Sequence, residues 1–215
     1  LFSRLKKGLN TTYGAPLKDL LQTLDWRMAL ALIVFYKIGD TTLNVMNIPF
    51  LVELGFSKLE IANVAKFFGI SAMILGGVIG GLFLNRYGIL ASLMLCAFLQ
   101  LITSFMFIVQ SLIGCDLHVL IVTIGLENLG CGLGAAAFIA YLSSLCRAPY
   151  TATHFALLSS FASLTRIILS VVAGFLADAL SWPLFFTCVA CASLAFFLLL
   201  IYTAPQPYFR FKPAR

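Results

Sequence analysis

The sequence predicts an all-α integral membrane protein with six transmembrane helices. The chain has 215 residues, of which 61% are hydrophobic and only 10% are charged. Soluble domains are typically about 45–50% apolar and about 25% charged. The mean hydropathy is +1.03, and the apolar residues gather in six long windows. These observations together exclude an ordinary soluble domain.

The apolar windows are each long enough to cross a bilayer, which takes about 20 residues of helix. Short connections rich in glycine, proline and polar residues separate them. We expect the six helices at residues 28–48, 61–84, 90–109, 118–142, 153–177 and 184–202. Residues 1–27 then form a linker with a short amphipathic helix at 17–24, whose leucines recur at i, i+3, i+4 and i+7. Residues 203–215 form a basic tail.

The basic residues of the connections and tails predict the orientation. With the expected helices, Lys58 falls on one side of the membrane, and ten basic residues fall on the other: Arg4, Lys6, Lys7, Lys18, Arg27, Arg86, Arg147, Arg210, Lys212 and Arg215. The positive-inside bias places that richer side, with both termini, in the cytoplasm. It also explains the net charge of +6 without a nucleic-acid partner.

Motifs for catalysis or metal binding are missing from the sequence. Cys188 and Cys191 form a CxxC spacing inside an apolar window without a second ligand pair, so we interpret them as helix-packing residues. His118 and His154 lie near helix ends, where we expect interfacial positions. GxSxG and HExxH motifs are absent. We therefore expect no enzymatic activity, no catalytic residue, no metal and no cofactor.

The distribution of charged residues inside the apolar windows repeats every three windows. A charge at the bilayer centre costs about 2.5–3.5 kcal/mol on translocon scales. The third and sixth windows carry none, whereas the others carry Lys37, Asp40, Lys66, Glu127 and Arg166. The pattern predicts a three-plus-three repeat in which the third and sixth helices face lipid. "GLFLN" at 81–85 and "GFLAD" at 174–178 repeat a similar ending in the second and fifth windows.

Helical spacing groups the polar residues on faces. Ser159, Ser163, Arg166 and Ser170 share one face of the fifth helix, and Lys37, Asp40, Asn44 and Asn47 share one face of the first. Glu127 and Asn128 precede a glycine-rich segment at 130–134, which, like the glycines at 76–81, we interpret as close helix packing.

Alternative explanations exist for these charges. Lys37 and Asp40 can simply neutralise one another, and Lys66 can extend to the membrane surface. Glu127 and Arg166 have no partner within their own helices, so they require a partner on another helix or water. Counting Lys37, Lys66 and Arg166 against Asp40 and Glu127 leaves one positive charge. This surplus favours an anionic solute, and the two acids suggest coupling to protons.

Three stretches resemble the carboxyl-terminal half of AmpG-type muropeptide permeases of the Major Facilitator Superfamily. They are "LIVFYKIGD" at 32–40, "ENLGCGLGAAAFIAYLSSLCRAPYTATHFALLSS" at 127–160 and "AGFLADALSW" at 173–182. The resemblance covers about residues 16–202. "GLFLNRYG" at 81–88 is similar to the loop motif of the superfamily, with Asn85 in place of the usual aspartate and without the trailing basic residue.

The resemblance implies import of anhydromuropeptides across the bacterial inner membrane for peptidoglycan recycling. It implies a partner too, because the family has twelve helices in two halves and this chain has six windows. An amino-terminal six-helix half, in the same longer chain or a separate one, would complete the solute site. The substrate and proton pathway is expected to include Lys37, Asp40, Asn44, Glu127, Asn128 and Arg166.

Two further interpretations remain open at this stage. The chain can be an inactive fragment of a split transporter gene. It can also belong to a superfamily transporter for another anionic solute, such as an acyl-CoA.

Overall fold

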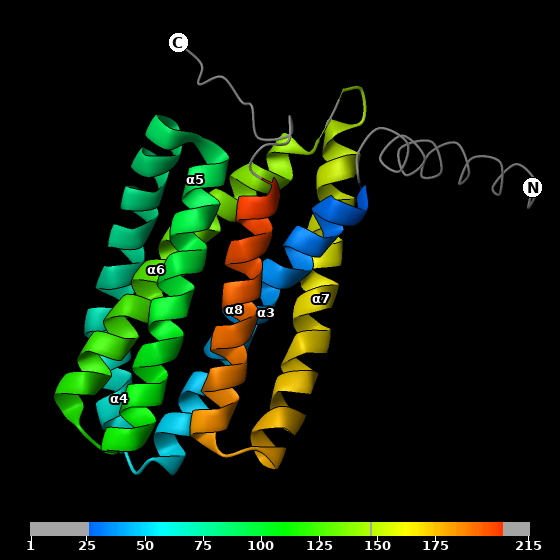
Figure 1. Cartoon of the computed structure of the whole chain (residues 1–215). Coiled ribbons are helices and arrows are strands. Elements are labelled where there is room, and N and C mark those ends of the chain that lie inside the picture. Colours follow the sequence, from blue (N-terminus) through cyan, green and yellow to red (C-terminus); the bar gives the residue numbers. More distant parts are fainter. Residues whose placement is uncertain (1–25, 147, 204–215) are drawn as a thin grey trace, which may run out of the picture.

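The protein is a bundle of long helices. A computed structural model describes residues 26–146 and 148–203, and these residues contain helices and short turns (Figure 1). The elements are α3 (Trp26–Glu53), α4 (Lys58–Val64), the π-helix η2 (Ala65–Gly69), α5 (Ile70–Ile113), α6 (Leu117–Ser144), α7 (Thr151–Ala179) and α8 (Trp182–Thr203). The amphipathic helix expected at 17–24 and the tail from residue 204 onward lie outside the described residues.

Five continuous helical segments of the described chain are long and apolar enough to cross a membrane. The six windows become five segments because 61–84 and 90–109 both lie in one run, Lys58–Ile113, of 56 residues. That run contains Gly88 with φ 83° and ψ 178°, a conformation that L side chains rarely adopt. At this glycine α5 folds back on itself, so its two parts stand side by side (Figure 1). The six separate helices of the prediction are therefore not confirmed.

Glycines hold α5 close to α6, as the sequence predicted. A Cβ at Gly76 would collide with the backbone carbonyl of Leu129, and a Cβ at Gly80 would lie 2.8 Å from the Cα of Leu133. From the other side, a Cβ at Gly132 would collide with the carbonyl of Met73. Side chains at these positions would force the helices apart, so the interpretation of these glycines as packing residues is confirmed.

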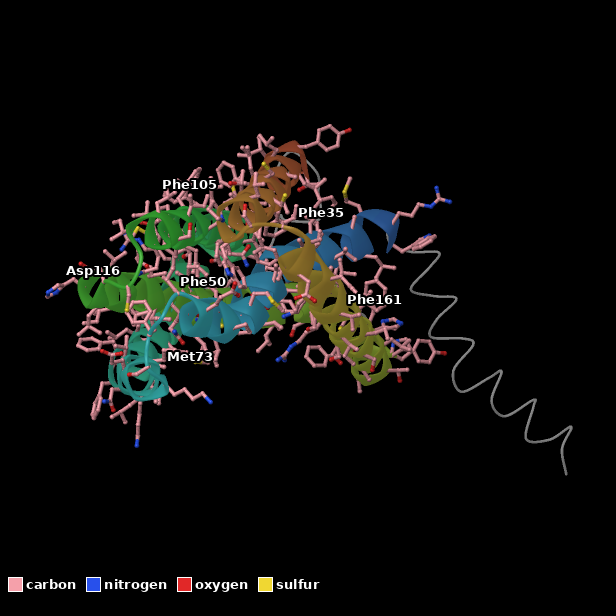
Figure 2. All side chains as sticks on the ribbon, turned by 90° about the horizontal axis from the view of Figure 1, so that it is seen from below. Phe35, Phe50, Met73, Phe105, Asp116 and Phe161 are labelled. Carbon is pink, nitrogen blue, oxygen red and sulfur yellow. The ribbon has the colours of Figure 1, made fainter. Side chains whose placement is uncertain are left out.

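Two apolar clusters fill the bundle, one above the other along the helices. The Tyr36 cluster includes Leu93, Ala97, Leu133, Phe138 and Phe196. The Phe50 cluster includes Leu43, Phe107, Ile124, Phe186 and Val189. Phe50 is fully buried among the helices in Figure 2, whereas Phe105 points outward and is 54% exposed. The space between the two clusters is where the polar residues of the interior gather.

α7 is the least buried of the long helices. Its buried residues form a single stripe of His154, Leu158, Ala162, Thr165 and Ala173. His154 is buried within the bundle at 1% exposed, whereas His118 is exposed; the interfacial depth expected for both stays a prediction. The packing role expected for Cys188 and Cys191 is wrong within the described chain, because both are exposed on α8.

Candidate functional site

A polar layer separates the two apolar clusters. On α3, Lys37 and Asp40 follow Tyr36 of one cluster and precede Leu43 of the other. Gln100 and Thr103 on α5 stand between Ala97 and Phe107, and Glu127 on α6 stands between Ile124 and Leu133. On α8, the fully buried Ser193 lies between Val189 and Phe196. Four segments that are distant in sequence thus place polar groups at one level of the bundle.

Lys37 and Asp40 form an ion pair within α3. The Lys37 Nζ lies 2.8 Å from the Asp40 Oδ2, and the side chains are 17% and 15% exposed. The same Nζ lies 5.2 Å from the ring centroid of Tyr36 and 5.0 Å from that of Phe138, within the range of cation–π attraction. The structure thus favours mutual neutralisation of the two charges, with an aromatic wall that supports the lysine.

Glu127 has a partner on another helix. Its Oε2 accepts a hydrogen bond from the Asn47 side-chain amide of α3, and the residue is only 6% exposed. Asn47 is a neutral group, so it satisfies a lone pair without cancelling a charge. Among the described residues, the ion pair of Lys37 and Asp40 is the one that meets the distance criterion for a salt bridge. The Glu127 carboxyl therefore lacks a cationic partner in this part of the chain.

A small cavity lies within the polar layer. Its volume is about 20 Å³, roughly the room that one water molecule needs. The side chains around it come from α3, α5 and α6: Asp40, Leu43, Asn44, Gln100, Thr103, Glu127, Gly130 and Cys131. The structure thus brings three of the six predicted site residues, Asp40, Asn44 and Glu127, to one cavity. Lys37 does not line the cavity, but it is ion-paired with Asp40, which does.

The other two predicted residues lie elsewhere. The Asn128 amide donates to the Ile124 carbonyl of its own helix at 2.9 Å, and it would contact a Cβ at Gly69 of η2. Arg166 is exposed on α7, next to the serines that were expected on its face. Lys66 is exposed as well. The predicted positive surplus is thus not located at the cavity, where two acids and one lysine leave a net negative charge.

Gln100 and Thr103 are not among the predicted site residues. Residues 90–109 carry no formal charge, and the prediction that this helix faces lipid rests on that. That conclusion is wrong for one side of the helix, although Phe98 and Phe105 do face outward. A signal was available, because buried polar residues recur on one face of α5: Gln100, Thr103, Ser104 and Gln110. In an apolar window, uncharged amides and hydroxyls indicate an internal polar site as charged residues do.

Most of the chain matches a known protein family. The family model described as Major Facilitator Superfamily matches residues 29–215. This range contains every described transmembrane segment except the first three residues of α3.

Individual relatives carry the name AmpG. The chain is 36% identical over 170 residues to the transporter AmpG 3 of Rickettsia typhi, covering 79% of this chain and 40% of that protein. It is 34% identical over 187 residues to AmpG 4 of Rickettsia conorii, covering 87% and 45%. It is 36% identical over 159 residues to AmpG 1 of Rickettsia prowazekii, covering 74% and 36%. The resemblance to AmpG-type permeases is confirmed, and the chain spans less than half the length of these relatives.

Proposed function

Because the chain belongs to the Major Facilitator Superfamily, we propose that it forms one half of an inner-membrane transporter that imports anhydromuropeptides for peptidoglycan recycling. The observation that carries this proposal is the similarity to AmpG proteins over a chain whose helices hold an internal polar layer. A lipid-facing bundle without transport would have little use for acids at this depth, since polar residues inside a membrane are costly and mark transport paths.

The proposal includes a partner half. The matched relatives are more than twice as long as the region they share with this chain. In this superfamily fold the solute site lies between two related bundles. An amino-terminal six-helix half, from the same longer chain or from a separate one, would face the polar side of α3 and α7. If the two parts of α5 are counted as two crossings, the chain has six crossings, which we propose form a three-plus-three repeat.

Arg166 is our candidate for contact with the solute. It is exposed on α7, and neighbouring serine hydroxyls are directed at their own helix. Ser163 donates to the Ser159 carbonyl at 2.9 Å, and Ser170 donates to the Arg166 carbonyl at 2.8 Å. A guanidinium on such a face is available to bind a carboxylate through two parallel hydrogen bonds. Anhydromuropeptides carry carboxylates, which suits this group.

Glu127 is our candidate for proton coupling. It is buried, and its partner Asn47 is neutral. Burial disfavours the charged form of a carboxyl, so the uptake of one proton removes an electrostatic cost. Asp40 is less suited to this role as long as Lys37 neutralises it at 2.8 Å.

The test is uptake of labelled anhydromuropeptide into vesicles that contain this chain together with an amino-terminal half. Arg166→Lys keeps the charge but loses the two-pronged geometry, so we expect uptake to fall by about tenfold or more while membrane insertion is unchanged. Arg27→Lys, at the exposed start of α3, is the matched control. Unaltered uptake by Arg166→Lys would remove this residue from the site.

A second arm of the experiment addresses the remaining alternatives. Uptake of an acyl-CoA in place of the muropeptide would reassign the solute. No uptake of any anionic solute with the partner half present would indicate an inactive fragment. Uptake that ignores an imposed proton gradient would refute the coupling.

A further inference from the structure

We propose that Lys66 on η2 lines the same aqueous path as Arg166 and binds a second negative charge of the transported solute. The inference rests on the proposed transport function and adds a specificity to it. The path would select solutes with two separated anionic groups, such as two carboxylates, over solutes with one. Lys66 does not line the cavity at Asp40 and Glu127, so that cavity leaves its charge unexplained.

Lys66 is a cation without a counter-charge in the described chain. Its side chain is exposed on a run that is long and apolar enough to cross a membrane. Among the described residues, the one ion pair joins Lys37 and Asp40. Glu60, the acid of the same run, caps α4 instead: its Oε2 accepts from the Ser57 backbone N–H at 2.9 Å and from the Ser57 hydroxyl at 2.7 Å. An ammonium at membrane depth is costly unless water or an anion meets it.

An apolar groove lies beside η2, but Lys66 does not line it. The groove has a volume of about 430 Å³ and lies between α6 and the segment of η2 and α5. Phe67 and Phe68 of η2 form one wall, and Gly125 and Leu129 of α6 belong to the other. The groove therefore accounts for the two exposed phenylalanines of η2 and leaves the lysine unassigned.

The short segment that carries Lys66 has an unusual backbone. η2 is a π-helix of five residues, a rare form that is frequent at functional sites. It packs on α6 at the polar layer, since a Cβ at Gly69 would lie 3.2 Å from the Asn128 Nδ2. Asn128 follows Glu127, whose carboxylate bonds to Asn47 of α3. η2 thus brings Lys66 to the level at which polar groups of α3 and α6 meet.

α3 lies between the segment that carries Lys66 and the helix that carries Arg166. It contacts both α4 and α7, and Figure 2 shows it between the first part of α5, labelled at Met73, and α7, labelled at Phe161. Lys66 lies eight residues from the start of its run at Lys58, about 12 Å along the helix. Arg166 lies 13 residues from the end of α7, about 20 Å along the helix. Both of these helix ends lie at the bottom of Figure 1, so both cations fall within a hydrocarbon core that is about 30 Å thick.

Two cations on separate walls suit a solute with two separated anionic groups. Arg166 offers a planar fork to one carboxylate, whereas Lys66 binds an anion as a point charge. Loss of Lys66 should weaken the binding of a solute that carries both carboxylates. It should hardly alter the binding of a solute in which the carboxylate bound by Lys66 is already blocked.

The first measurement is uptake of labelled anhydromuropeptide and of its singly amidated derivatives, one for each carboxyl, into vesicles that contain this chain and an amino-terminal half. We expect the wild type to import the derivative blocked at the Lys66 contact less well by about tenfold or more. Lys66→Met should lose this discrimination through a higher KM for the unmodified compound, and Lys66→Arg should retain it. Lys58→Met, at the exposed start of α4, is the matched control and should behave as the wild type.

The second measurement asks whether position 66 is in contact with water. Lys66→Cys is treated in the same vesicles with a membrane-impermeant, negatively charged methanethiosulfonate, and mass spectrometry locates the label. Phe105→Cys is the control, because Phe105 is 54% exposed and points outward in Figure 2. Phe105 also lies eight residues from its own end of the run at Ile113, which matches Lys66 in depth. We expect labelling at position 66 and none at position 105.

The outcomes separate this inference from the proposed function. Lys66→Cys as unreactive as Phe105→Cys would overturn the inference and assign the lysine to the lipid headgroups. Equal discrimination by Lys66→Met and the wild type would overturn it too, while muropeptide uptake by the wild type would leave the proposed function standing. If the vesicles import an acyl-CoA in place of the muropeptide, a KM raised by Lys66→Met but not by Lys58→Met would support the second anion contact and refute only the solute assignment. No uptake of either solute by the wild type would overturn both proposals.

Discussion

α3 and α7 both carry a polar face, but the polar groups of the two faces differ in their bonding partners. On the polar face of α3, Asp40 pairs with Lys37 of the same helix, and the Asn47 amide donates to Glu127 of α6. The polar face of α7 remains open, with Arg166 exposed and its serine hydroxyls bonded to their own helix. Asp40 and Asn47 on the first face have partners within the chain, whereas Arg166 on the second awaits a solute or a partner half.

This contrast separates two parts of one bundle. The pocket at Asp40 and Glu127 is lined by three helices of the same chain, so its walls do not need a partner half. A site on an open helix face can hold a larger solute once a second wall is present. Substitutions of the polar residues on α3 should therefore change the stability of the isolated chain, and matched substitutions of the polar residues on α7 should mainly change assembly and uptake.

The largest expected effect comes from removing Lys37. Lys37→Met leaves Asp40 without its partner in a half-buried position, and we expect a loss of about 2–3 kcal/mol in the free energy of unfolding. Arg166→Met on α7 should cost less than about 0.5 kcal/mol, because that side chain is exposed. Thermal unfolding of the purified chain in detergent measures both. Equal losses for the two variants would contradict the distinction between a closed and an open face.

A double variant sharpens this result. Lys37→Met combined with Asp40→Leu removes both charges, and we expect it to recover most of the stability that the single lysine variant loses. A double variant that is no more stable than Lys37→Met would indicate that the aromatic contacts of Lys37 with Tyr36 and Phe138 matter more than the ion pair.

The next effect concerns Glu127. Glu127→Leu leaves the part-buried Asn47 amide without its acceptor, which should cost about 1–2 kcal/mol. Glu127→Gln retains an oxygen for Asn47 and should cost less than half as much. On α7, Asp178 is an exposed acid, and Asp178→Leu should change stability by about 0.5 kcal/mol or less. The measurement is the same unfolding assay, and a Glu127→Gln variant as unstable as Glu127→Leu would assign the role to charge instead of hydrogen bonding.

A pair of glycines tests the same contrast at the backbone. A Cβ at Gly39 of α3 would lie 2.8 Å from Gln100 Oε1 and 3.0 Å from Ser193 Oγ, whereas a Cβ at Gly174 of α7 would meet nothing within 4 Å. We expect Gly39→Ala to destabilise the chain by about 1–2 kcal/mol through overpacking. Gly174→Ala should stabilise it by about 0.5–1 kcal/mol, as alanine does inside a helix. Shifts of the same sign in the two melting temperatures would be the contrary outcome.

The sequence predicted the membrane class and the elements well, because long apolar windows and helical spacing are local properties. The face of α3 and the close approach at Gly76 and Gly132 follow from such spacing. The turn at Gly88 falls in the break predicted between 61–84 and 90–109, because glycine accepts a positive φ. Which polar groups meet across helices depends on contacts between distant segments, so the sequence could not place Asp40 at the cavity and Arg166 outside it. Asn47 was recognised on the face of α3, but its bond to Glu127 joins two helices 80 residues apart.

The smallest expected effect on stability lies on the open face of α7. Ser163→Ala removes a hydroxyl that bonds only to its own helix at 2.9 Å, so the isolated chain should change by less than about 0.5 kcal/mol. Thr103→Val, on α5 beside the pocket of Asp40 and Glu127, removes a comparable bond to the Leu99 carbonyl. With a partner half present, Ser163→Ala should reduce muropeptide uptake more than it reduces stability, because Ser163 lies about one turn from Arg166 on the same face. Unfolding of the isolated chain and uptake by the assembled transporter measure the two effects. A Ser163→Ala variant that loses stability without the partner would mean that this face of α7 is already covered within the chain.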